Sequence, residues 1–215
     1  MDFDTVLRTT GACRDFAPDP VPADLLYRAV ELARFAPQGG NRQGVRLVIV
    51  QDQEKRRQLA ELYQGAMAAH RSGTGPVQQQ PRRGTAMTVR QGSDYLAEHL
   101  AEVPVIIVVC VDLNLVHATD TGLGRLSIVG GGSVYPFVQN LLLALRSLGL
   151  GASITTLLCE YEPQVKQLLA IPAEYATAAH LPVGYPARPF PTRLSRRTVP
   201  ELAFIDEFGV PLGTE

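Results

Sequence analysis

The segment 36–43 reads Ala-Pro-Gln-Gly-Gly-Asn-Arg-Gln and stands between a helical pattern and a strand pattern. Before it, apolar residues recur at helical spacing from about Pro22 to Ala36. Pro22 suits a first helical position, and the proline and glycine pair that follow Ala36 end the helix. After it, the apolar run from Val45 to Gln51 predicts a strand that is buried on both faces. The segment is therefore a polar connection at the junction of a helix and a buried strand.

The rest of the chain predicts one domain, 1–215, because 215 residues that are 46% apolar can bury a single core. Further helices are expected at 4–9, 54–70, 94–101, 133–148 and 163–170, and further strands at 103–111 and 180–184, with a strand or an extended run at 151–158. The helix at 133–148 has little polar face, so we expect it to be central. Since helices and strands do not alternate strictly, the fold class is α+β.

Composition excludes several classes of function. A net charge of −1 gives no bulk attraction to nucleic acid, and clusters such as 55–57 are interpreted as solvated surface. No apolar run is long enough to span a membrane, and the acidic N-terminus lacks a signal-peptide core, so we expect a cytoplasmic protein. The three cysteines and four histidines lack the spacing of a disulfide framework or metal site. Phosphate-binding, dinucleotide-binding and nucleophile-elbow motifs are absent.

Four polar clusters at the ends of elements remain as candidates for chemistry. They are 8–14, 38–43, 153–156 and the tail arginines Arg193, Arg196 and Arg197. Arginine forks suit a phosphate, and Asn or Gln amides can donate to and accept from the edge of a heterocycle. Such clusters suit a large, flat, anionic ligand. From the residues alone, ordinary turns and a basic tail remain the alternative.

Six motifs, taken in chain order, resemble the nitroreductase family of FMN-dependent oxidoreductases from about residue 4 to 202. They are Arg-x-x-x-x-x-Arg-x-Phe at 8–16, the segment 36–43, Val-Pro-Val-Ile-Ile at 103–107, Gln-Asn-Leu-Leu-Leu-Ala at 139–144 with Ser-Leu-Gly-Leu-Gly at 147–151, Leu-Leu-Ala-Ile-Pro at 168–172 and Pro-Val-Gly-Tyr-Pro at 182–186. The resemblance implies a mixed sheet surrounded by helices, in an intertwined homodimer with FMN at the subunit interface.

The resemblance also implies which residues contact the cofactor. Arg14 is expected at the pyrimidine edge or ribityl chain, and Arg8 or Thr10 near the phosphate, together with Arg196 and Arg197. Ile154, Thr155 and Thr156 are expected beside the reactive part of the ring. From the partner subunit we expect contacts by Pro37, Gln38, Gly39, Asn41 and Gln43.

The chain departs from the family pattern near its start. Family members often carry Arg-Ser just before the Arg-x-Phe element, whereas Gly11 and Ala12 stand near this place here. Which residue supplies the first phosphate contact is therefore open. Tryptophan, which often follows the second motif, is absent from the chain, and Thr156-Leu157 replaces a frequent Glu-Gly pair.

The implied function is reduction of nitro, quinone or related small acceptors by NAD(P)H in a ping-pong hydride mechanism. The protein orients and shields the ring, so no residue is assigned as a catalytic acid or base. Residues 71–92 are glycine- and proline-containing with few large apolar side chains, and we interpret them as a loop or lid. A non-catalytic FMN-storage protein and a related flavin chemistry, such as dehalogenation or flavin destruction, are the alternatives.

Overall fold

The structure, a computed structural model, describes residues 1–74 and 87–213, with 87–91 described by their backbone alone. One sheet has the strand order β1-β2-β4-β3, and each of these pairings is antiparallel. Its strands are β1 (Val45–Val50), β2 (Val105–Asp112), β3 (Gly151–Ala152) and β4 (Tyr175–Gly184). β2 and β4 are the long central strands, so the sheet is built around them.

Helices supply the remaining regular structure in the described residues. They are α1 (Phe3–Thr9), α2 (Ala23–Ala33), α3 (Gln53–Ser72), α4 (Met87–His99), α5 (Tyr135–Ser147) and α6 (Glu162–Leu169). Short 3₁₀ turns lie at Gly39–Asn41, Leu100–Glu102, Leu113–Leu115, Thr121–Leu123, Val129–Gly131, Leu157–Tyr161 and Val199–Glu201. Over the described residues, none of the helices combines the length and hydropathy needed to cross a bilayer.

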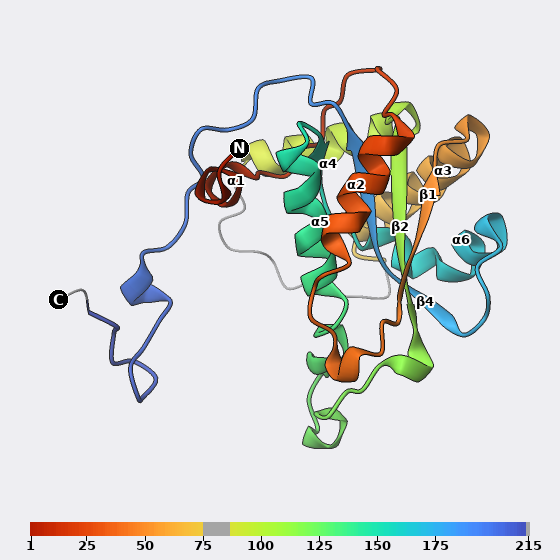
Figure 1. The fold of residues 1–215 in the computed structure, drawn as a ribbon. Helices are drawn as coiled ribbons and strands as arrows, with labels where there is room; N and C mark the ends of the chain where they lie inside the picture. The colour runs from red at the N-terminus through yellow and green to blue at the C-terminus, as the bar shows by residue number, and fades with distance from the viewer. Residues whose placement is uncertain (75–86, 214–215) are drawn as a thin grey trace.

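The sheet lies between two helical layers (Figure 1). On β2, Ile107 and Val109 face a core shared with α2 and α5, whereas Ile106 and Val108 face a core shared with α3, α4 and α6. A strand covered on both faces must be apolar at every position, which explains the unbroken run at 105–111. α5 is central, as expected, because its leucines occupy the middle of the first core.

A long arm follows β4 from about residue 186 (Figure 1). It passes beside α1 and then runs away from the sheet, where Leu202, Ile205 and Phe208 are exposed. Exposed apolar side chains that gather on one segment, rather than lying scattered over the surface, are typical of an interaction surface. The arm therefore carries apolar surface that the chain itself does not cover.

Three sequence-based expectations need correction. The helix predicted to reach residue 36 ends at Ala33, and β1 is not buried on both faces, since Ile49 is 38% exposed. β1 is an edge strand, where the helical layers cover the sheet incompletely. The predicted loop 71–92 is wrong at both ends, because α3 continues to Ser72 and α4 begins at Met87. From Gly92 onward, the first buried positions of α4 are Leu96 and Ala97, and the sequence before them has few large apolar residues. Residues 75–86 lie outside the described residues.

Candidate functional site

Two of the four predicted polar clusters lie side by side in the structure. The backbone N–H of Cys13 donates to the carbonyl oxygen of Ala152 at 2.9 Å, and that of Ala17 donates to Tyr185 at 2.8 Å. The segment 10–17 therefore runs along β3 and the end of β4. This pairing brings the cluster at 8–14 beside the cluster at 153–156.

A small cavity of about 80 Å³ lies between these two segments. Thr10, Gly11 and Ala12 form one wall, and Ser153 and Ile154 form the other. The predicted residues Thr10 and Ile154 thus share one pocket, and Ile154 also has exposed surface. The cavity is completed by Leu142, Arg146, Leu150, Ala152 and Phe190.

Thr155 and Arg14 lie near the tyrosine of α3. The Thr155 hydroxyl donates to the hydroxyl oxygen of Tyr63 at 3.4 Å, and the backbones of Thr155 and His180 exchange hydrogen bonds of 3.0 and 2.8 Å. Burial raises the pKa of Tyr63, and the positive charge of Arg14 partly offsets this effect. Thr156 is exposed at the start of the next turn. The cluster at 153–156 is thus anchored on one side and open on the other.

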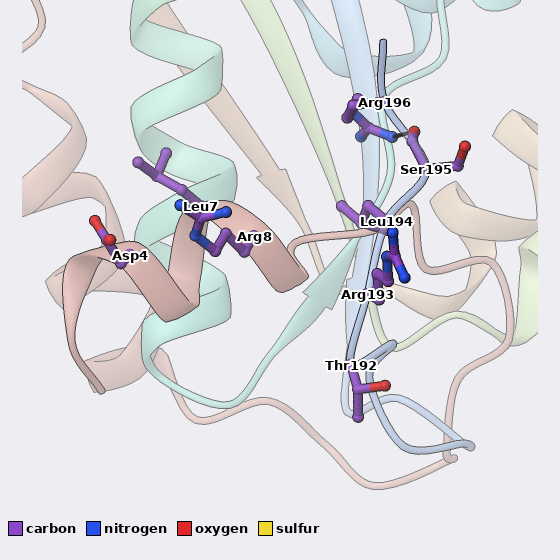
Figure 2. A pocket seen from close by; sticks show the side chains of 8 residues that line it. All are labelled: Asp4, Leu7, Arg8, Thr192, Arg193, Leu194, Ser195 and Arg196. Carbon is purple, nitrogen blue, oxygen red and sulfur yellow. Dashed lines mark hydrogen bonds between the residues drawn. The ribbon is translucent and has the colours of Figure 1, made fainter. Parts of the chain in front are cut away.

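The arm brings a second set of arginines to α1. Arg8 of α1 and Arg193 and Arg196 of the arm line an open cavity of about 800 Å³. Figure 2 shows these three side chains around the space between α1 and the arm. Asp4 supplies a carboxylate to the same cavity. Three cations against one anion make this space attractive to a dianionic phosphate.

The structure places two arginines differently from the sequence-based prediction. Arg197 is exposed and does not line the cavity, although the resemblance implied a phosphate contact there. Arg193, which was grouped with the tail but was not assigned to the phosphate, does line it. The cavity is lined by the consecutive residues 192–196 of the arm, and Arg197 lies just beyond this stretch.

The remaining cluster, 37–43, lies at the other end of α5 (Figure 1). The N–H of Gly39 donates to Ser133 Oγ at 2.9 Å, just before α5 begins, whereas Arg146 is in the last turn of α5. A helical rise of 1.5 Å per residue separates these ends by roughly 20 Å. Within one chain, the cluster at 37–43 therefore lies far from the cavity that Arg146 lines with Thr10 to Ala12, Ser153 and Ile154.

The backbone of this cluster is unusual. Asn41 and Gln43 have φ angles of 50° and 52°, in the left-handed region, and the Gln43 amide nitrogen donates to Asn41 Oδ1 at 3.2 Å. Gln38 Oε1 is buried beside a cavity of about 50 Å³ and has no hydrogen-bond partner among the described residues. Pro37 is exposed. The cluster is a polar surface with a defined backbone conformation, and the buried acceptor Gln38 Oε1 still lacks a hydrogen-bond donor among the described residues.

Arg146 and Ser153 were not singled out from the sequence as individual site residues. Both are buried, both line the 80 Å³ cavity, and each has a side-chain atom without a hydrogen-bond partner among the described residues. One signal was present: a single arginine in an apolar helix whose other side chains left little polar face.

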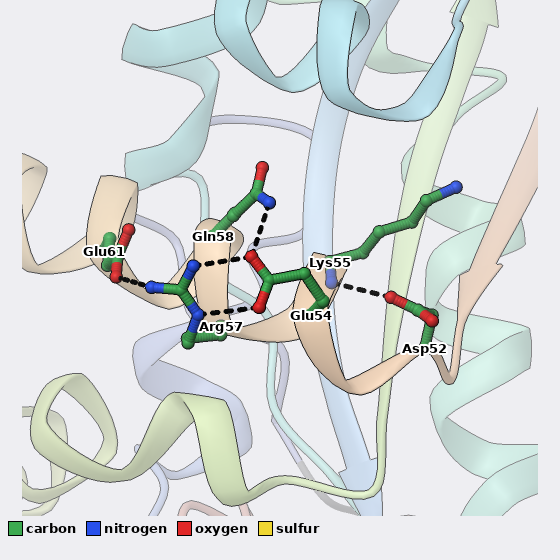
Figure 3. A network of polar contacts seen from close by, with 6 residues as sticks. All are labelled: Asp52, Glu54, Lys55, Arg57, Gln58 and Glu61. Carbon is green, nitrogen blue, oxygen red and sulfur yellow. Dashed lines mark hydrogen bonds and ion pairs between the residues drawn. The ribbon is translucent and has the colours of Figure 1, made fainter.

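A separate polar network on α3 does not belong to the site (Figure 3). Arg57 pairs with Glu54 and Glu61, and this contact lowers the pKa of Glu54 to about 2. These charges are exposed and satisfy one another, as the interpretation of 55–57 as solvated surface expects. Arg56 differs, since it donates to the carbonyl oxygens of Ala101 and Val103 and ties α3 to the turn before β2. Among the described residues, no group of three or more histidine, cysteine or acidic side chains could hold a metal.

Comparison with known proteins places this architecture in a family. The family model described as the nitroreductase family matches residues 7–185, which is most of the chain. The chain belongs to the nitroreductase family. The α+β fold expected from the sequence is thereby confirmed for this nitroreductase-family chain, and the matched range contains all four strands.

Curated relatives of this nitroreductase-family chain have different activities. It is 31% identical over 183 residues to 5,6-dimethylbenzimidazole synthase of Rhodospirillum rubrum, which covers 83% of this chain and 79% of the relative. It is 24% identical to iodotyrosine deiodinase 1 of Rattus norvegicus, covering 87% of this chain but only 63% of that protein. Family membership alone therefore does not name the reaction.

Solved structures agree on the fold. Iodotyrosine deiodinase bound to FMN and 3-iodo-L-tyrosine superposes with a TM-score of 0.71 at 23% identity, covering 94% of this chain and 98% of that one. The FMN-dependent nitroreductase of Mycobacterium smegmatis in complex with NADPH gives a TM-score of 0.67 at 20% identity, covering 95% and 97%. At these identities the likeness establishes the shared fold.

Proposed function

We propose that this chain is an FMN-dependent oxidoreductase that uses NAD(P)H to reduce a small acceptor of the nitro or quinone type. The observation that carries the proposal is the convergence of α1, the segment 10–16, the residues 153–156 and the arm. Thr10 to Ala12, Ser153 and Ile154 line one pocket with Phe190 of the arm, and Arg8, Arg193 and Arg196 line another. FMN-bound and NADPH-bound relatives of the same fold support the choice of cofactor and reductant.

The residues present fit FMN. The three arginines match the phosphate, and Arg14 offers a positive charge for the pyrimidine edge. Ile154, Thr155 and Thr156 would lie beside the ring. Buried polar atoms without partners, including Ser153 Oγ and Gln38 Oε1, are what a pocket shaped for a polar ligand leaves unsatisfied. When bound, FMN supplies the acceptance and donation of hydride; the protein orients the ring and excludes water.

We further propose that the site is completed by a second copy of the chain. Pro37, Gln38, Gly39, Asn41 and Gln43 would reach the flavin from the partner. Within one chain they lie at the opposite end of α5 from Arg146, roughly 20 Å from the cavity that Arg146, Thr10 to Ala12, Ser153 and Ile154 line. The exposed apolar side chains on the arm support an interface that covers them. A homodimer built in this way has two equivalent sites.

Removing the Asn41 side chain tests this role. Asn41→Ala and Asn41→Gly should each weaken FMN binding about tenfold without changing the dimer, since a side-chain hydrogen bond to the cofactor is lost. Glycine is the matched variant, because it removes the same amide while fitting the left-handed backbone at φ 50°. FMN affinity from fluorescence quenching and mass from sedimentation provide the readouts. Wild-type affinity in both variants would remove Asn41 from the site.

The activity is tested by anaerobic reduction of the reconstituted protein. We expect NADH or NADPH to bleach the bound flavin, and menadione or a nitroaromatic compound to restore its absorbance with multiple turnovers. A protein that binds FMN but is reduced by neither nicotinamide would overturn the oxidoreductase proposal and favour a flavin-storage role instead. Because the relatives differ in activity, analysis of the organic product then separates simple reduction from dehalogenation or flavin cleavage.

A further inference from the structure

Arg146 is a buried cation without an anionic partner among the described residues. It lies in the last turn of α5, is 7% exposed, and appears in none of the ion pairs between described residues. One Nη donates to Thr9 Oγ1 at 3.0 Å, and the guanidinium lies 3.7 Å from the centre of the Phe190 ring. Its Nε has no acceptor. The helix C-terminus and the ring stabilise the charge, but the buried Nε–H donor is left without a partner among the described residues.

Ser153 is a second buried polar side chain with an unpaired atom in the same cavity. It is 3% exposed, and its Oγ has no hydrogen-bond partner among the described residues. Arg146 and Ser153 line the same 80 Å³ cavity. Leaving a buried polar atom unsatisfied costs free energy, so two such side chains around one cavity point to a ligand that carries oxygen atoms.

The cavity lies between the proposed phosphate and ring positions. Along the first segment, Arg8 lines the arginine cavity and Thr10 to Ala12 line the small cavity. Arg14, two residues further on, lies near Tyr63, which accepts from Thr155 at the proposed ring position. The arm closes the same region, because a Cβ on Gly11 would lie 3.0 Å from Pro191 and 3.5 Å from Leu194. A volume of about 80 Å³ holds roughly three water-sized groups, which is too little for a flavin ring but enough for part of a chain.

We propose that Arg146 and Ser153 bind the ribityl chain of FMN, the hydroxylated linker between its phosphate and its ring. This inference rests on the proposed function. Arg146 Nε would donate to a ribityl oxygen, and the Ser153 hydroxyl can donate or accept. Arg146 and Ser153 give the cavity polar side chains, whereas Gly11 and Ala12, which line it from the N-terminal segment, have none.

Three flavins separate the parts of the site. FMN has the phosphate, ribityl chain and ring; riboflavin lacks the phosphate; lumiflavin lacks the ribityl chain as well. Ser153→Ala should weaken FMN and riboflavin about fivefold each, and Arg146→Lys about tenfold or more, with lumiflavin unchanged in both. Equilibrium binding is measured by fluorescence quenching of the full chain. Ser147→Ala and Arg57→Lys are the matched controls, since Ser147 is exposed at the end of the same helix and Arg57 lies in the network on α3.

Stability is checked on the flavin-free protein by thermal unfolding. Ser153→Ala removes an atom that has no protein partner, so its Tm should not fall, and it keeps the test valid if Arg146→Lys unfolds. Unchanged FMN affinity in Ser153→Ala, or equal losses for all three flavins, would overturn the inference while leaving the proposed function intact. A wild-type chain that binds none of the three would instead defeat the proposed function.

Discussion

Replacing Arg193 and Arg196 together by alanine should weaken FMN binding about 100-fold and leave riboflavin binding nearly unchanged. Hydrogen bonds from a guanidinium to a phosphate contribute at least about 1.5 kcal/mol each, and two bonds at this lower value correspond to a factor of this size. Riboflavin has no phosphate and should not respond. The effect should shrink at high salt, because the cavity between α1 and the arm is open to solvent and its charges are screened.

Two further variants sharpen this result. Arg188→Ala is the matched control, because Arg188 is on the same arm, is mostly exposed and pairs with Asp15 rather than lining the cavity. Asp4→Asn should strengthen FMN binding a few-fold, since it removes the one carboxylate from the same cavity. Equal weakening of FMN and riboflavin in the double variant would show that the arginines act through the fold and not on a phosphate.

Acid should destabilise the folded chain through His180 by about 3 kcal/mol. The ring is 1% exposed, and both nitrogens lack partners among the described residues. Burial lowers the pKa of His180 from 6.5 to about 4. Because the folded value is depressed, the stability contribution is complete above pH 6.5 and is lost as the pH falls toward 4. Linkage at 1.36 kcal/mol per pH unit gives the magnitude.

The comparison of variants isolates this histidine. His180→Leu should show a smaller fall in the free energy of unfolding between pH 7 and pH 4 than the wild type, measured in urea without flavin at fixed protein concentration. Other acid-sensitive groups, such as Glu54, act equally in both proteins. His117→Leu, at an exposed position, is the control and should retain the wild-type dependence. Parallel pH profiles for wild type and His180→Leu would show that the histidine is not buried in its neutral form.

The sequence predicted the elements that have a clear hydrophobic pattern of their own. It did not predict features that depend on which other elements pack against a segment. The positions of β2 and α5 could be predicted, because their sequences are apolar at nearly every residue and such a sequence indicates an element that is buried on most sides. The exposure of β1 was not, since an apolar run does not say whether helices will cover an edge strand. The first turns of α4 were missed because residues 87–93 contain only two apolar side chains, Met87 and Val89, and the buried Leu96 and Ala97 come later in the helix.

The candidate site shows the same division. Arg8 and Arg196, far apart in the chain, were expected near one phosphate, and the structure brings both to one cavity. The exchange of Arg197 for Arg193 could not be predicted, because side-chain direction in an extended arm depends on how that arm packs. The helical pattern did not predict a role for Arg146, because the residue only interrupts a leucine-rich sequence. Its contacts with Thr9 and Phe190, and the cavity that it lines with Ser153, become visible only in the structure.

The central claim is that this nitroreductase-family chain binds FMN at a site shared between two copies. The most direct measurement is the absorbance spectrum of the purified protein, before and after incubation with FMN and removal of the excess, on a dimer-sized fraction. We predict flavin bands near ~450 nm, with one FMN retained per chain. A folded protein that is colourless and retains no FMN after this reconstitution would contradict the account.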